Sequence, residues 1–273
     1  MLHLNLLGMS VAIACEDSAV SALIRANFSA LAVAPAHSTI PALSYAVTQD
    51  DRGLSLQRAT VDTPNLWTGL DPGELIFLLE KDLTIEAQKH RPDYYFLHAA
   101  ALAYRDNAIL LIGRSGSGKS TTCWGLLHHG CTYLSDELAP IDLNTRQVLP
   151  YPHALCLKSA PAAPYPLPMS TLRTPPTLHV AIEDLPAPAG AHPVPLGTIV
   201  LLRHIGAERS PSVTELSTAE AGMLIYANAL NPLCHAGDGL DAALDIARRC
   251  RTLSLTTGRL DTSVTALLAA LDS

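Results

Sequence analysis

The sequence predicts an α/β protein in which a larger core follows a small α+β lobe. Two observations predict this fold class. An apolar run at residues 109–112 enters a glycine-rich segment, 113–120, and a helical run leaves that segment and stops at Gly130. A second short apolar run, 131–135, comes next, so that strand, helix and strand alternate as they do in a sheet covered by helices.

The amino-acid composition indicates a globular protein and argues against a nucleic-acid-binding one. Of the 273 residues, 48% are hydrophobic and 16% are charged, which is typical of a well-packed globular protein. This length allows one large domain or one domain plus a small one. The formal net charge is −7, and the chain has no run of lysine and arginine that would neutralise nucleic-acid phosphates. We therefore expect no nucleic-acid partner.

The cysteines and the apolar runs predict the cellular location. The six cysteines show neither C-x-x-C nor zinc-site spacing, which favours free, buried thiols in a reducing cytosol. The apolar opening, residues 1–15, lacks the basic start of a secretion signal, so we interpret it as a first strand. No apolar run reaches the length of a transmembrane helix. We expect a cytoplasmic protein without a membrane partner.

Residues 1–93 carry no catalytic motif and are predicted to form the small lobe, packed against a core that spans residues 94–273. Apolar residues at helical spacing predict a helix over 18–31. Alternating residues predict a hairpin over 42–60 that turns at 50–53.

The last helix of the lobe is predicted from a capping box. Asp71 is expected to be the N-cap, Pro72 occupies the first helical position, and Glu74 stands three residues after the cap. The helix is expected to run to about His90.

Residues 113–120 match G-x-x-x-x-G-K-[ST], the phosphate-binding loop, in the strand–loop–helix context that this motif requires. Because glycine has no Cβ, consecutive backbone N–H groups can approach a polyphosphate closely, and the helix N-terminus adds partial positive charge. We expect Lys119 to reach the β- and γ-phosphates of ATP, and the Ser120 hydroxyl to ligate the bridging Mg²⁺. The expected nucleotide-binding residues are Gly113, Arg114, Ser115, Gly116, Ser117, Gly118, Lys119, Ser120 and Thr121.

An acidic pair ends the strand predicted at 131–135. A strand–helix–strand crossover is almost always right-handed and parallel, so the carboxyl ends of both strands meet at one sheet edge. This places Asp136 and Glu137 beside the glycine-rich segment, where ligands bind in such sheets. There the pair would hold Mg²⁺ or accept a proton from an attacking hydroxyl. A solvated acidic pair at a strand end is the alternative.

Residues 150–195 hold 12 of the 20 prolines, which predicts a looped excursion with a substrate-facing flap and edge strands. Lys158, within it, is expected either to contact phosphate or to lie simply at the surface. The elements predicted after it are a strand at 198–202, a helix from a capping box at Ser217 and Glu220 to about 228, a helix at 240–249, a strand at 253–257 and a helix at 262–271.

Three segments together resemble a known family. Residues 96–102 read Phe-Leu-His-Ala-Ala-Ala-Leu in a strand predicted over 94–102, residues 113–121 contain the glycine-rich motif, and residues 134–137 read Leu-Ser-Asp-Glu. This set resembles HPr serine kinase/phosphorylase and, more closely, the shorter HPr kinase-related proteins of bacterial gene clusters. Some of these phosphorylate a serine of a lasso-peptide precursor.

The resemblance implies a P-loop core of the HPr kinase/PEP carboxykinase type. It also implies an ATP- and Mg²⁺-dependent kinase acting on a serine (or threonine) of a small protein or ribosomal peptide precursor. Relatives of this kind often assemble, so a homo-oligomer is a possible partner state. Separately from the resemblance, we expect the lobe to help recognise the acceptor.

The resemblance assigns roles by residue. Lys119 is the phosphate-binding lysine and Ser120 a Mg²⁺ ligand. His98 is a catalytic-site histidine and Asp136 the proton acceptor. Glu137 replaces the family's second, metal-binding aspartate. The late catalytic arginine is Arg203, with Arg209 as a competitor. Without the resemblance, a lone histidine in an apolar strand such as His98 is more often a core residue.

Two departures from the family pattern are visible. The E-x-R-G-x-G segment, which supplies a further Mg²⁺-binding glutamate, is absent near the proline-rich region, and this removes support for the reverse, phosphorylase reaction. The family's N-terminal regulatory domain is not recognisable in residues 1–93. Two other functions stay open: a small-molecule hydroxyl kinase of the shikimate-kinase type, and a non-catalytic ATP-binding regulatory protein.

Overall fold

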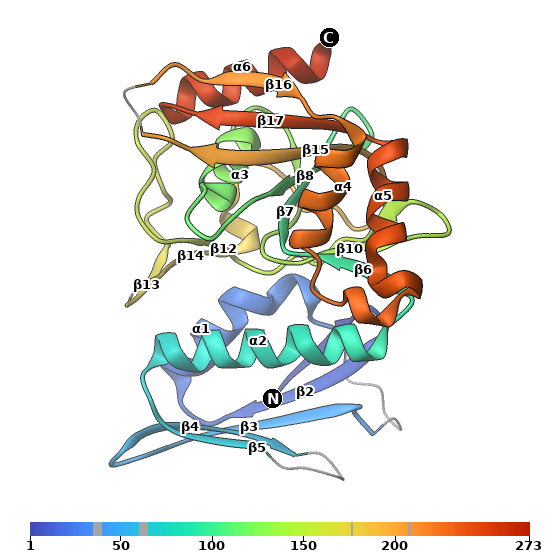
Figure 1. The fold of residues 1–273 in the computed structure, drawn as a ribbon. Coiled ribbons are helices and arrows are strands. Elements are labelled where there is room, and N and C mark those ends of the chain that lie inside the picture. The colour runs from blue at the N-terminus through green and yellow to red at the C-terminus, as the bar shows by residue number, and fades with distance from the viewer. Residues whose placement is uncertain (35–39, 60–64, 176, 207–208) are drawn as a thin grey trace.

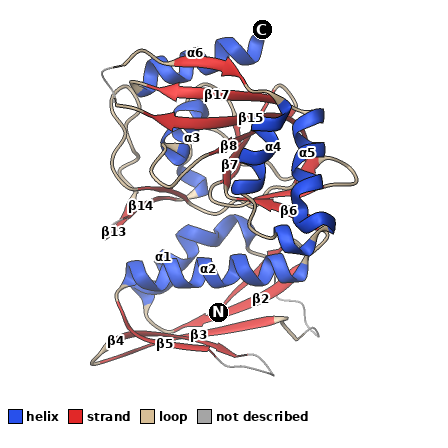
Figure 2. Ribbon diagram, viewed as in Figure 1, coloured by secondary structure: helices blue, strands red, loops and turns tan. Residues whose placement is uncertain are grey.

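The computed structural model describes residues 1–34, 40–59, 65–175, 177–206 and 209–273. It has an N-terminal sheet, two helices packed on that sheet, and a larger mixed sheet beyond those helices (Figure 1). The larger sheet carries helices on both faces (Figure 2). The fold is therefore mixed α/β, as the sequence predicts.

The N-terminal sheet has the order β1-β2-β3-β4-β5. Its strands are β1 (Leu2–Leu6), β2 (Met9–Cys15), β3 (Leu43–Asp50), β4 (Gly53–Ala59) and β5 (Asn65–Leu70). The hairpin of β3 and β4 is the one predicted, although residue 60 lies outside the described residues. The prediction of one first strand over 1–15 is wrong. Leu7 and Gly8 both have positive φ, 53° and 94°, and turn the chain into an antiparallel hairpin.

Two helices cover this sheet, α1 (Ser18–Phe28) and α2 (Pro72–His90). Asp71 and Glu74 form the predicted capping box of α2, with the Glu74 N–H donating to Asp71 Oδ1 at 2.9 Å. A short 3₁₀ turn, Ser29–Leu31, continues α1 to the end of the helix predicted there. One face of α2 packs into the lobe's apolar cluster, which also contains Tyr94, Phe96, Leu138 and Tyr151. The lobe and the rest of the chain thus share one core cluster.

The larger sheet runs β6-β10-β11-β15-β8-β7-β9, and β17 adds β16 at the side of β15. Its strands are β6 (Tyr94–Leu97), β7 (Ala99–Tyr104), β8 (Asn107–Ile112), β9 (Thr132–Ser135), β10 (Ala139–Asp142), β11 (Gln147–Val148), β15 (Val194–His204), β16 (Ser212–Glu215) and β17 (Arg251–Thr257). β8 and β9 point the same way, as the crossover argument requires, but antiparallel β7 lies between them.

The single strand predicted over 94–102 is broken at His98. The His98 N–H donates to the Asn228 carbonyl at 2.9 Å instead of joining a strand ladder, so the chain leaves β6 and enters β7 in another part of the sheet. Because of this break, His98 lies between the end of β6 and the start of β7 instead of inside a strand.

Helices cover both faces of this sheet, which explains the continuous apolar run of β8. Ile109 and Leu111 pack with α3 (Lys119–Leu127) and α6 (Leu260–Asp272). Leu110 and Ile112 face the opposite side, where α4 (Thr218–Ala227) and α5 (Leu240–Arg249) pack. Short 3₁₀ turns at Pro232–Cys234 and Ala236–Gly239 join α4 to α5.

The proline-rich region forms a small sheet of its own, with the order β12-β14-β13. Its strands are β12 (Leu155–Leu157), β13 (Leu172–Thr174) and β14 (Thr177–Val180), followed by a 3₁₀ turn at Ile182–Asp184. The looped excursion predicted for 150–195 therefore contains short strands, and β12 lies against α3. Within the described residues, no helix is long and apolar enough to cross a membrane.

Replacing Gly125 with alanine is expected to destabilise the fold. Alanine normally favours a helix over glycine by about 1 kcal/mol. Here a Cβ would lie 2.6 Å from Val264 Cγ2, where α3 meets α6, and such overpacking costs about 1–3 kcal/mol. Chemical denaturation should show a net loss of up to about 2 kcal/mol. Val264→Ala in the same chain should recover part of that loss, because it removes the colliding methyl group; simple additivity of the two losses would contradict this explanation.

Candidate phosphotransfer site

Four strand ends meet at one edge of the larger sheet. Ile112, the last residue of β8, pairs with Ala99 at the start of β7 and with Leu201 near the end of β15. Ser135, the last residue of β9, pairs with Ala101 of β7. His98, Gly113 and Asp136 flank three of these ends, and Arg203 is the second-last residue of β15. The topology therefore brings together residues that are separated by more than 100 positions.

Residues 113–120, here named the glycine loop, connect β8 to α3 at this edge. Gly116 and Gly118 have φ of 81° and 93°, a region that a side chain disfavours, and a Cβ on Gly116 would meet nothing within 4 Å. Gly118 caps α3 without a side-chain hydrogen bond, so the first N–H groups of the helix stay available to an anion. The buried Ser117 hydroxyl has no partner among the described residues. This open, donor-rich cradle fits a phosphate group.

Two lysines hold positions at the glycine loop. Lys119 is buried, and its Nζ donates to the Gly113 carbonyl at 3.1 Å. Burial lowers the pKa of Lys119, while the charges of Glu137 and Asp136 act in the opposite direction. Lys158, which follows β12, donates to Ser115 Oγ at 3.2 Å. Lys158 is exposed and lies beside the loop, a position compatible with both expectations stated for it.

Asp136 has no exposed surface. Its Oδ2 accepts from the Cys156 N–H at 3.4 Å, and its Oδ1 has no hydrogen-bond partner among the described residues. Burial, and then the nearby charge of Glu137, raise the pKa of Asp136 to about 7, although His153 and a hydrogen bond from Ser120 act against the rise. A buried carboxylate oxygen without a partner, next to the Ser120 hydroxyl, offers the oxygen donors that Mg²⁺ prefers.

Glu137 has an exposed side chain, in contrast to the buried Asp136 that precedes it. Its φ of 74° is a left-handed conformation that a non-glycine residue seldom adopts, and its side chain is 47% exposed. His98 Nε2 donates to Glu137 Oε2 at 2.5 Å. This hydrogen bond is the main reason why the pKa of Glu137 is lowered. The pair presents an ionised carboxylate, oriented by a histidine, to the space outside the sheet edge.

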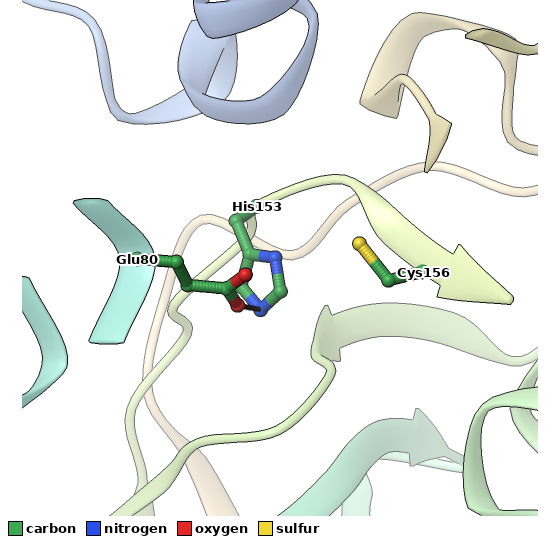
Figure 3. Close-up of side chains that lie close together, drawn as sticks. All are labelled: Glu80, His153 and Cys156. Carbon is green, nitrogen blue, oxygen red and sulfur yellow. Dashed lines mark ion pairs between the residues drawn. The ribbon is translucent and has the colours of Figure 1, made fainter. Parts of the chain in front are cut away.

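Glu80, His153 and Cys156 lie close together (Figure 3) and form a layer in which His153 is buried and the other two are partly buried. His153 Nε2 donates to the Asp136 backbone carbonyl and lies 3.4 Å from Glu80 Oε1 of α2. Burial alone would lower the pKa of His153, but the charges of Glu80 and Asp136 and this hydrogen bond raise it. The layer ties the lobe helix α2 to the loop that carries the acidic pair.

Glu80, His153 and Cys156 also form a group of metal-ligand type, with donor atoms within 4.8 Å of one another. Burial raises the pKa of the Cys156 thiol well above its ordinary value, so that it stays protonated. Its Sγ lies 3.5 Å from His179 Nδ1. Each member of the group already has a protein partner, which favours a structural role over a metal site.

A cavity of about 500 Å³ opens beside these residues. His98, Glu137, Ser115 and Lys158 line it from the sheet edge, and α2 lines it from the lobe. Asp136 and Lys119 are not among its lining residues. Ser115 of the glycine loop and the His98–Glu137 pair therefore face the same space, whereas Asp136 does not line it.

The arginines expected near the site take different positions. Arg203 is exposed at the shared edge, and its charge adds to the hydrogen bonds from Ser217 that lower the pKa of Glu220 in α4. Arg114 is exposed on the glycine loop. Arg209 lies beyond β15, where its carbonyl approaches Gly258. Of these three arginines, Arg203 is the one that lies near the carboxyl end of β15.

Some residues of the site are not visible in the sequence pattern. Glu80 sits in a helix with ordinary amphipathic spacing, and His153 and Cys156 stand in a proline-rich stretch without metal-site spacing. Their roles arise from contacts between segments that are separate in the sequence, such as Glu80 with His153 and Cys156 with Asp136. The one local signal is Lys158, which follows a short apolar run.

The stability of the protein is expected to fall as pH rises from about 4.5 to 7. The raised pKa of Asp136 means that its protonated form stabilises the fold, and that this stabilisation is lost as pH rises through about 7. The raised pKa values of Glu80 and His153 act with the same sign. Asp136→Asn should flatten this slope in melting temperatures measured from pH 4.5 to 8; an unchanged slope would show that the Asp136 carboxyl group does not titrate in this range.

No protein-family model matches the chain, and no curated protein matches it. Among solved structures, the HPr(Ser) kinase/phosphatase from Coxiella burnetii matches 65% of this chain and 99% of its own, with 10% sequence identity and a TM-score of 0.30. This chain is therefore similar to that kinase/phosphatase only at a level that establishes neither a common fold nor a common activity.

Proposed function

We propose that the protein is an ATP- and Mg²⁺-dependent kinase that transfers the γ-phosphate to a serine or threonine hydroxyl of a small protein or peptide precursor, of which lasso-peptide precursors are one class. One observation carries the proposal. The glycine loop, through Ser115, and the His98–Glu137 pair line the same cavity. A phosphate cradle and a half-exposed carboxylate that share one space are the arrangement that phosphoryl transfer to a hydroxyl needs.

The glycine loop supplies the nucleotide site in this proposal. Its backbone N–H groups and the N-terminus of α3 bind the phosphates. Lys119 and Lys158 add positive charge from two sides of the loop. Ser120 and the unpartnered Oδ1 of Asp136 would hold the magnesium ion, which neutralises charge on the β- and γ-phosphates when bound.

The carboxylates of Glu137 and Asp136 have different roles in the proposed transfer. The acceptor oxygen forms a bond to the γ-phosphorus, the bond from that phosphorus to the β-phosphate oxygen breaks, and the hydroxyl proton moves to a carboxylate. Glu137 is 47% exposed and lines the cavity, whereas Asp136 has no exposed surface. Exposure therefore favours Glu137 as proton acceptor and Asp136 as metal ligand, which exchanges the roles that the family resemblance implies.

His98 is assigned a positioning role. Its ring donates to Glu137 at 2.5 Å and so fixes the carboxylate in the direction of the cavity. Arg203, at the same sheet edge, is the cation proposed to stabilise charge that develops during transfer.

ADP release tests the proposal when it is measured with and without hydroxyl-bearing acceptors. A kinase of this type should release ADP in proportion to phosphorylated serine peptide and should be slow without it. ADP release that responds to a small alcohol and not to serine peptides would favour a small-molecule kinase. Nucleotide binding without acceptor-dependent ADP release would favour a non-catalytic ATP-binding protein.

A further inference from the structure

Helix α2 forms one wall of the cavity along most of its length. One face of the helix packs into the lobe, and the other face lines the cavity. Leu75, Leu79 and Leu83 have no exposed surface and pack into the lobe cluster. The residues on the other face, spaced three or four apart, line the cavity, and they are Gly73, Ile76, Phe77, Glu80, Lys81, Thr84, Ile85 and Gln88.

The length of this wall distinguishes between kinds of acceptor. Gly73 and Gln88 lie 15 positions apart on one helix, which corresponds to about 22 Å at about 1.5 Å per residue. An extended chain rises about 3.3 Å per residue, so the wall matches about six or seven residues of extended peptide. A small-molecule alcohol would contact only a fraction of it. The shape of the cavity therefore favours a polypeptide segment.

Apolar side chains are exposed along this wall. Phe77 is 64% exposed and Ile85 is 39% exposed, although both stand on a helix whose opposite face is fully packed. Leu230, 40% exposed, lines the cavity from the opposite, sheet side. Large apolar residues that gather at a cavity provide anchoring contacts for a bound chain.

The carboxylates that line the cavity have partners, whereas its lysines have no acidic partner among the described residues. The two lining carboxylates have cationic or histidine partners, since Glu137 accepts from His98 and Glu80 lies against His153. Lys81 is exposed and has no ion-pair partner among the residues that the structure describes, and Lys158 contacts only the neutral Ser115 hydroxyl there. An acceptor that carries a carboxylate would complement Lys81.

We propose that the acceptor binds in this cavity as an extended segment of about six or seven residues along α2. The acceptor hydroxyl lies at the His98–Glu137 pair, an apolar side chain packs against Phe77 and Ile85, and an acidic side chain pairs with Lys81. This inference rests on the proposed kinase function for the role of the segment. It adds the conformation of the acceptor segment and the sequence features that the segment should carry.

The test uses a library of heptapeptides with serine at the centre and random residues at the other positions. The full-length protein selects peptides without nucleotide, and mass spectrometry identifies those retained. The same library is then incubated with ATP and Mg²⁺, and incorporated phosphate is measured. Phe77→Ala is compared with Leu66→Ala. Leu66 is similarly exposed, at 61%, but lies on β5 outside the cavity lining.

We expect wild-type protein to retain peptides enriched in one apolar and one acidic position. Phe77→Ala should reduce their retention at least about tenfold, whereas Leu66→Ala should leave it unchanged. Lys81→Glu should replace the acidic preference by a basic one. Retention with these features but without phosphate incorporation would support the groove and contradict the kinase proposal. Phosphorylation that is equal in the Phe77 and Leu66 variants and has no sequence preference would overturn the groove and leave the kinase intact. Absence of both retention and phosphorylation would overturn both.

Discussion

Lys119→Ala is expected to reduce phosphoryl transfer to a serine peptide by at least about 10²–10³-fold, the range for loss of one preorganised group that stabilises transition-state charge. Lys119 is buried and its ammonium group lies over the glycine loop, where its Nζ donates to Gly113. No other group on α3 can deliver a positive charge to that position. Steady-state transfer rates at saturating and at low ATP would measure the effect on both turnover and nucleotide affinity.

Lys89→Ala is the matched control. Lys89 is a lysine on the exposed end of α2, 65% exposed, and its ion pair with Glu86 is of the surface type that contributes little to stability. Its loss should leave transfer unchanged. Equal activity of the Lys119 variant and the Lys89 variant would remove the glycine loop from the chemistry and end the kinase interpretation.

The second large effect is expected at Glu137. Glu137→Gln keeps the shape of the side chain but cannot accept a proton, so transfer should slow by about two to four orders of magnitude while nucleotide affinity changes little. Asp136→Asn should instead weaken Mg²⁺-dependent nucleotide binding, because Asp136 is buried beside Ser120 and does not line the cavity. Separate measurement of kcat and of nucleotide affinity in both variants distinguishes these two effects.

The opposite pattern would be equally informative. A kcat loss confined to Asp136→Asn, with normal turnover in Glu137→Gln, would restore the roles implied by the family resemblance. It would also mean that the acceptor reaches a carboxylate with no exposed surface in this structure.

His98→Ala tests whether His98 orients the Glu137 carboxylate. That variant should lower kcat and alter its pH profile in proportion to the loss of Glu137 orientation, whereas a core histidine would affect stability alone.

Local signals in the sequence predict much of the fold correctly. The capping boxes at Asp71 and Ser217 each mark the start of the helix that the structure contains there. The glycine loop lies between a buried strand and a helix, as its motif requires. Each of these features depends on residues within about ten positions of one another. Local sequence alone is therefore enough to predict them.

The errors arise where distant segments decide the structure. The strand predicted through His98 breaks because its N–H pairs with Asn228, 130 positions away. Within the proline-rich region the prediction of edge strands is correct, but the sequence did not give their bounds or their order, β12-β14-β13. The contrast between buried Asp136 and half-exposed Glu137 likewise depends on packing by His153 and Cys156.

The central claim is that one cavity brings a nucleotide phosphate and a serine hydroxyl together. The most direct test incubates the protein with ATP, Mg²⁺ and two matched peptides, one with serine and one with alanine at the acceptor position, and reads their masses. The account predicts a gain of about 80 daltons, the mass of one phosphoryl group, on the serine peptide alone, and none with the Lys119→Ala variant. ADP release with no phosphorylated serine peptide across the whole library would contradict it.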